Sequence, residues 1–157
     1  MKPSVYIETT IPSYLTAWRS SELLMASNQQ LTRKWWDESR FRFELFISEF
    51  VVQEASAGDP TAAKRRLEVI SDLPKLEITT QAETLAIYLL KQAALPTKAR
   101  LDALHIAVAT VHGMEYLLTW NCRHIANAVL RSKIELVCRN AGYEPPIICT
   151  PQELMES

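Results

Sequence analysis

The sequence predicts an α/β fold, with a mainly parallel sheet of four to five strands and helices on both of its faces. Short runs of β-forming residues recur along the chain, and longer segments with the apolar spacing of helices separate them. Strands that alternate with helices usually pair in parallel, because each helix returns the chain to the end of the sheet where the next strand starts. We therefore expect functional residues where the strands end, at the carboxyl edge of the sheet.

Length and composition predict one domain over residues 1–157. With 48% hydrophobic and 22% charged residues, the chain has the composition of an ordinary globular protein. At this length a domain buries about two-thirds of the surface of its unfolded chain. No internal repeat, low-complexity tract or linker interrupts the sequence.

Five segments are predicted as strands, because each is short and rich in β-branched, aromatic or leucine residues. In chain order they are SVYIE (4–8), LFIS (45–48), LEIT (76–79), YLLT (116–119) and IIC (147–149).

Helical segments fill the intervals between the predicted strands. The segment Glu22–Phe43 is long, polar and aromatic, and is expected to form one extended helix or a helical pair. Residues 60–73 begin with a proline, which favours a helix start, and carry apolar side chains at helical spacing. Residues 81–95 repeat this spacing and stop before a proline. Residues 98–113 are apolar around nearly the whole circumference, which predicts a buried helix that ends at Gly113.

Charge, glycine and cysteine usage exclude several functional classes. The net charge is −1, so a nucleic acid would have to meet a local basic surface or a bound metal ion. Three glycines are too few for a glycine-rich nucleotide-binding loop, and three widely spaced cysteines predict neither a zinc site nor a disulfide framework. The sequence shows no signal-peptide pattern and no apolar run of about 18 residues. We therefore expect a cytoplasmic protein without membrane contact.

Acidic and amide side chains follow the predicted strands. Glu8 ends the first strand, and Glu54 comes six residues after the end of the second. Asn121 follows the fourth strand, and Asp102 lies early in the apolar helix, where a carboxylate needs a partner or a cation. Each acid alone could be an ordinary surface or helix-end charge. Together they would meet at one sheet edge, where three carboxylates repel one another unless a cation lies among them.

Such a group of carboxylates suits Mg²⁺ or Mn²⁺. These hard cations prefer oxygen ligands and retain several waters, so a few carboxylates are sufficient. A cation held in this way can activate water and neutralise charge on a transferring phosphoryl group. The pattern therefore predicts metal-assisted hydrolysis of a phosphodiester.

Four stretches of the sequence carry a family resemblance. They are Glu8 after the first strand, SEFVVQE (48–54), DALHIAVAT (102–110) and LLTWNCRHIA (117–126). In this order they resemble the PIN domain family, and more closely the VapC-type toxins of bacterial toxin–antitoxin pairs. The resemblance extends from Val5 to about Ile148, and DALHIAVA followed by YLLTWN is its most specific part. It implies a three-layer α/β/α sandwich and a ribonuclease activity that depends on Mg²⁺ or Mn²⁺.

The resemblance also assigns a site, residue by residue. Glu8 matches the first acid of the family, Glu54 the second and Asp102 the third. Asn121 stands where the family usually has a fourth acid, and Thr119 matches the threonine of that motif. The resemblance thereby implies that the three acids and Asn121 are both catalytic and metal-binding. The family usually has aspartate at the first position, and Glu8 is one methylene longer. A neutral amide in the fourth position favours one firmly held cation and a weaker second one.

Six further side chains near the predicted site have more than one interpretation. Thr9 and Thr10 could bind water on the metal, although capping of the next helix is the simpler role. Ser48 could hydrogen-bond a site carboxylate or cap its own helix. His105, one helical turn after the third acid, could act as a general acid or contact an RNA phosphate, although packing between helices is simpler. Arg123 and His124 could bind an RNA phosphate or lie on the surface at the start of the next helix.

Two functions remain open at this point. The first is a metal-dependent endoribonuclease of the toxin type, for which the resemblance implies an RNA substrate, an antitoxin protein partner and a homodimer. The segment Glu22–Phe43 would be the surface where the antitoxin docks. The second is a PIN-like module that binds RNA or protein with little or no catalysis, which Asn121 and the lack of net positive charge favour. The two functions differ in whether a divalent cation supports RNA cleavage.

Overall fold

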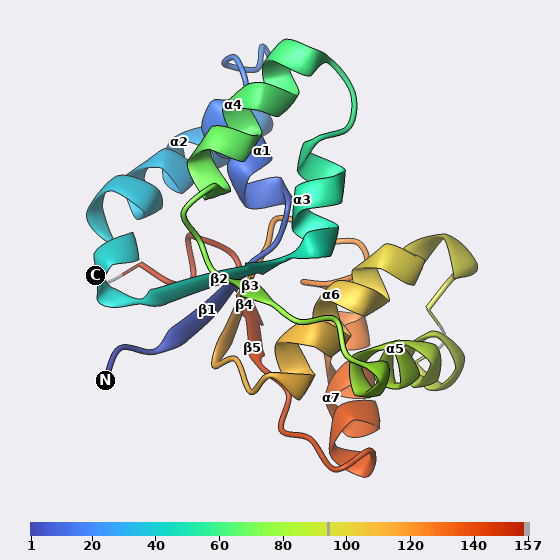
Figure 1. Cartoon of the computed structure of the whole chain (residues 1–157). Coiled ribbons are helices and arrows are strands. Elements are labelled where there is room, and N and C mark those ends of the chain that lie inside the picture. Colours follow the sequence, from blue (N-terminus) through green and yellow to red (C-terminus); the bar gives the residue numbers. More distant parts are fainter. Residues whose placement is uncertain (94, 156–157) are drawn as a thin grey trace.

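The computed structural model describes residues 1–93 and 95–155, and a five-stranded sheet lies at its centre (Figure 1). All neighbouring strands pair in parallel, in the spatial order β3-β2-β1-β4-β5. The strands are β1 (Ser4–Ile7), β2 (Glu44–Ser48), β3 (Lys75–Leu76), β4 (Tyr116–Leu118) and β5 (Ile147–Cys149). The predicted α/β fold with a parallel sheet is confirmed.

Helices cover both faces of this sheet. The α-helices of the described residues are α1 (Thr10–Thr16), α2 (Leu23–Glu38), α3 (Glu49–Ala55), α4 (Pro60–Ile70), α5 (Thr80–Gln92), α6 (Arg100–Val111) and α7 (Ala128–Asn140), with short 3₁₀ turns at Arg40–Arg42 and Thr97–Ala99. α1 contacts α2 and α4 on one side of the sheet, and α5 contacts α6 and α7 on the other (Figure 1). The result is the predicted three-layer α/β/α arrangement.

The central strand β1 is buried on both faces. Val5, Tyr6 and Ile7 have no exposed surface, and the strand pairs with β2 on one side and β4 on the other. A strand covered by helices on both faces needs a continuous apolar run, and the sequence VYI supplies it. Tyr6 brings a hydroxyl group into this apolar layer, where it needs a hydrogen-bond partner.

The direction in which strands are added reverses at β1. From β1 the chain adds β2 and then β3 on one side, and later places β4 and β5 on the other side. In open parallel sheets such a reversal forms a crevice at the carboxyl ends of the strands. Glu8 follows β1 and Thr119 follows β4, and a hydrogen bond of 2.6 Å between their side chains joins these two strand ends.

The buried helix α6 carries two of the predicted site residues. Every residue from Ala103 to Thr110 is buried, as the apolar sequence predicts. The helix ends at Val111, and Gly113 follows with a φ of +70° while its N–H bonds the carbonyl of Thr110 at 3.0 Å. Glycine adopts this left-handed conformation without steric cost, which confirms the predicted end of the helix.

Several predicted elements differ by one to three residues at an end, and two differ in ways that change the description of the chain. The strand expected over 76–79 is β3 at Lys75–Leu76, because Thr79 instead caps α5 by accepting a hydrogen bond from the Ala82 N–H at 3.1 Å. The segment Glu22–Phe43 forms α2 and then a separate 3₁₀ turn, close to the predicted helical pair. None of the helices in the described ranges is both long and apolar enough to cross a membrane.

Candidate metal centre

Glu8 follows β1 directly and lies at the carboxyl edge of the sheet. Only 4% of the residue is exposed. Its Oε1 accepts hydrogen bonds from Thr10 Oγ1 at 2.5 Å and from Thr119 Oγ1 at 2.6 Å. Burial raises the pKa of Glu8, whereas the positive charge of His105 and the two threonine hydroxyls act to lower that pKa. The two threonine hydroxyls fix the position of Glu8 Oε1.

Glu54 approaches the same edge from α3, which starts immediately after β2. Its side chain is 29% exposed. Its Oε1 accepts a hydrogen bond from Thr9 Oγ1 at 2.6 Å and lies 2.5 Å from His105 Nε2. Partial burial would raise the pKa of Glu54, but the hydrogen bond and charge of His105, with the hydroxyl of Thr9, lower it overall. The carboxylate is therefore held in its ionised form.

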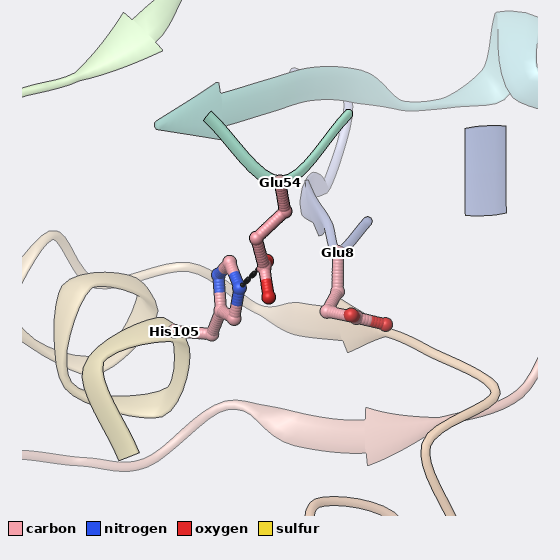
Figure 2. Close-up of side chains that lie close together, drawn as sticks. All are labelled: Glu8, Glu54 and His105. Carbon is pink, nitrogen blue, oxygen red and sulfur yellow. Dashed lines mark hydrogen bonds and ion pairs between the residues drawn. The ribbon is translucent and has the colours of Figure 1, made fainter. Parts of the chain in front are cut away.

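Glu8, Glu54 and His105 form a carboxylate–histidine group that is small enough to hold one ion. A possible ligand atom from each residue lies within 4.8 Å of the other two. Figure 2 shows Glu54 between the imidazole of His105 and the carboxylate of Glu8. An octahedral Mg²⁺ ion with bonds of about 2.1 Å spans ligands up to roughly 4.2 Å apart, so small rotations suffice. The two carboxylates supply the oxygen ligands that Mg²⁺ and Mn²⁺ prefer.

Asp102 and Asn121 lie in a second cluster, which includes His124. Asn121 Nδ2 donates a hydrogen bond to Asp102 Oδ1 at 3.0 Å, and His124 Nδ1 lies 2.8 Å from Asp102 Oδ2. Asn121 Oδ1 accepts from the backbone N–H of His124 at 3.1 Å. Thr119 links the two sets of residues, since its hydroxyl donates to Glu8 and accepts from the backbone N–H of Asn121 at 2.9 Å.

The structure thus divides the four predicted ligands into two pairs. Glu8 and Glu54 meet each other, whereas Asp102 and Asn121 meet His124. Both carboxylate oxygens of Asp102 and both ends of the Asn121 amide have hydrogen-bond partners. A metal-ligand role for Asp102 or Asn121 stays a prediction, and it requires each of them to exchange one of these bonds for the cation. A second acid at position 121 would repel Asp102, whereas the amide donates to it.

The hydroxyl groups of Thr9 and Ser48 have hydrogen-bond partners other than those predicted. Thr9 makes no side-chain cap on α1 and donates to Glu54 instead. Ser48 neither caps α3 nor reaches a carboxylate, because its hydroxyl lies 2.7 Å from the Tyr6 hydroxyl. Thr10, which the sequence offered with Thr9 as a helix cap or a contact to metal-bound water, donates to Glu8 instead. The sequence prediction missed Tyr6 as a site residue, although a tyrosine within a fully apolar strand was a signal that could have found it.

The predicted contact between His105 and RNA is wrong for this structure. The side chain of His105 has no exposed surface, so the interpretation of a buried histidine is the correct one. Burial lowers the pKa of His105, but the hydrogen bond to Glu54 and the nearby negative charges outweigh it and raise that pKa. Arg123 is exposed and His124 is partly buried against Asp102, so their contact with RNA stays a prediction.

Comparison with known proteins supports the fold. No protein-family model matches the chain, and no curated protein matches it. The crystal structure of VapBC2 from Rickettsia felis, bound to a DNA fragment from its promoter, contains a chain of similar structure. The TM-score is 0.53 with 16% sequence identity, over 93% of this chain and 97% of that one. The likeness extends over nearly the whole of both chains, and at this identity it shows a shared fold.

Proposed function

We propose that this protein is a divalent-metal-dependent endoribonuclease, the toxin of a toxin–antitoxin pair. The observation that carries the proposal is the pair of carboxylates, Glu8 and Glu54, which come together at the reversal point of a parallel sheet. Two acids so close together, one of them buried, are costly without a cation. The PIN resemblance of the sequence and the VapBC2 likeness of the fold support the same function.

The side chains of the site have separable roles in this proposal. A bound Mg²⁺ or Mn²⁺ would supply the positive charge that neutralises a phosphate and activates water. Glu8 and Glu54 would hold the cation, and their threonine partners keep the carboxylates oriented. Asp102 holds the His124 ring at the same edge, and the exposed guanidinium of Arg123 is available to an RNA phosphate.

An antitoxin would dock over α2 and the segment before it. Three large apolar side chains are exposed there, with Trp18 at 82%, Leu23 at 85% and Leu24 at 68%. Arg19 and Arg33 line an adjoining surface cavity of about 490 Å³. Apolar surface beside two arginines suits a protein segment that carries both apolar and acidic side chains. This patch supports the docking segment expected from the sequence.

The second candidate is a binding module with little catalysis. Asn121 favours it, because its amide is occupied with Asp102 and His124 and brings no negative charge. Such a module would bind RNA or protein equally well with and without divalent cations.

Incubation with RNA separates these functions. The purified protein is mixed with structured and single-stranded RNAs in Mn²⁺, in Mg²⁺ or in chelator, beside Glu54→Gln, Asp102→Asn and the surface controls Glu68→Gln and Asp72→Asn. We expect cleavage by the wild type and both controls in metal only, with a loss of at least about 100-fold in the two site variants. Intact RNA in every wild-type lane, with RNA binding unaffected by chelator, would support the binding module instead.

A further inference from the structure

A chain of buried hydrogen bonds leads from β2 through β1 and α6 to Glu54. Ser48 Oγ lies 2.7 Å from the Tyr6 hydroxyl, which lies 2.6 Å from His105 Nδ1. His105 Nε2 lies 2.5 Å from Glu54 Oε1. Ser48, Tyr6 and His105 have no exposed surface. Each group belongs to a different element, so the packing of the fold itself sets the position of the carboxylate.

In the hydrogen bond between His105 and Glu54, the histidine must be the donor. An ionised Glu54 only accepts hydrogen bonds, so His105 Nε2 carries the hydrogen of this bond. This holds for the neutral ring, where Nδ1 accepts from Tyr6, and also for the charged ring, where Nδ1 donates to Tyr6. In either case the Tyr6 hydroxyl, itself hydrogen-bonded to Ser48, satisfies the ring nitrogen that Glu54 does not use.

The same contacts keep His105 from serving as a metal ligand. A ligating imidazole nitrogen must be free of hydrogen and must face the ion. One nitrogen of His105 faces Tyr6 and the other faces Glu54. Glu54 Oε1 already accepts from both Thr9 and His105, which leaves Oε2 for the cation.

We infer that Ser48, Tyr6 and His105 are positioning residues, which hold Glu54 Oε1 so that Oε2 faces the divalent cation. The inference rests on the proposed function, because it assumes that Glu54 is a metal ligand. Groups that hydrogen-bond a metal ligand typically contribute a factor of about 10 to 100 to metal affinity. Removal of the His105 donor is therefore expected to weaken metal binding without changing which atoms bind the metal.

Manganese binding measured by electron paramagnetic resonance tests this inference. Mn²⁺ is titrated into the wild type, into His105→Phe, which keeps a ring but has no donor, and into His105→Gln, which restores an N–H donor. Tyr6→Phe removes only the hydroxyl, and Tyr88→Phe is its matched control on the partly exposed face of α5. We expect a dissociation constant about 10 to 100 times higher for His105→Phe, a smaller increase for Tyr6→Phe, partial recovery with glutamine and no change for Tyr88→Phe.

Pulsed measurements on the wild-type complex separate the possible outcomes. The inference predicts no nitrogen nucleus bonded directly to Mn²⁺, and a directly bonded imidazole nitrogen would overturn it while leaving the metal site intact. Equal affinities of the wild type, His105→Phe and Tyr6→Phe would also overturn it. If His105→Phe does not fold, as judged by circular dichroism, Tyr6→Phe decides the question. Absence of Mn²⁺ binding by the wild type would refute the proposed function together with the inference.

Discussion

Replacement of Glu8 by glutamine is expected to abolish the response of this protein to divalent cations. The buried carboxylate would become a neutral amide of nearly the same size, so a metal ligand and its charge are lost while the packing is kept. We expect RNA cleavage in Mn²⁺ to fall by at least about 100-fold. We also expect the increase in Tm that Mn²⁺ gives the wild type to disappear, because a ligand stabilises only a protein that binds it.

The metal-free variant provides the control for this experiment. Removal of a buried charge from a pair of carboxylates relieves its desolvation and repulsion, so the Tm of metal-free Glu8→Gln should equal or exceed that of the wild type. Glu68→Gln makes the same chemical change on the exposed surface of α4 and should leave both readouts unchanged. Full cleavage by Glu8→Gln would mean that Glu8 is not part of the metal centre.

Replacement of Trp35 by alanine is expected to have the largest effect on stability. Trp35 is fully buried, its ring stacks on Phe43 with 5.8 Å between centroids, and its Nε1 donates to the carbonyl of Leu154 at 3.3 Å. Truncation of a large buried aromatic side chain costs about 3–5 kcal/mol of unfolding free energy. For a chain of this length the Tm should fall by roughly 10 °C.

Trp18→Ala is the matched control, because Trp18 is 82% exposed. Urea unfolding followed by circular dichroism should show a lower midpoint for Trp35→Ala and a nearly unchanged one for Trp18→Ala. Equal midpoints for the two variants would contradict the core position of Trp35.

The fold was predictable because its signals are local. The apolar run of β1, the proline at the start of α4 and the glycine after α6 each determine backbone structure within a few residues. The limits of β3 were not predictable in this way. Residues 77–79 have strand-forming character, but the hydrogen bond from Ala82 to Thr79 places the end of that segment in the cap of α5.

The sequence predicted where in the fold the candidate site lies. It did not predict all of the contacts between the site residues. The rule that parallel strands end at one edge brings Glu8 and Glu54 together, as expected from their places in the sequence. The rotation of α6 decides which of its side chains faces them, and this depends on tertiary packing. His105 meets Glu54, while Asp102, one turn earlier, meets Asn121 and His124.

Asn121 has a structural role that the sequence did not reveal. In the sequence it stands where the resemblance leads us to expect a fourth acid. In the structure its Nδ2 donates to Asp102 and its Oδ1 caps the turn at His124, so the residue holds a neighbouring carboxylate in place. A third carboxylate remains beside the candidate metal centre without a fourth negative charge to oppose it.

Crystals grown with millimolar Mn²⁺ give the most direct test of the metal centre. Anomalous diffraction locates manganese independently of any assumption about its ligands. We expect a peak within about 2.2 Å of one carboxylate oxygen of Glu8 and one of Glu54, with His105 still hydrogen-bonded to Glu54. An ordered site without such a peak, or a peak bound only by Asp102 and His124, would contradict this expectation.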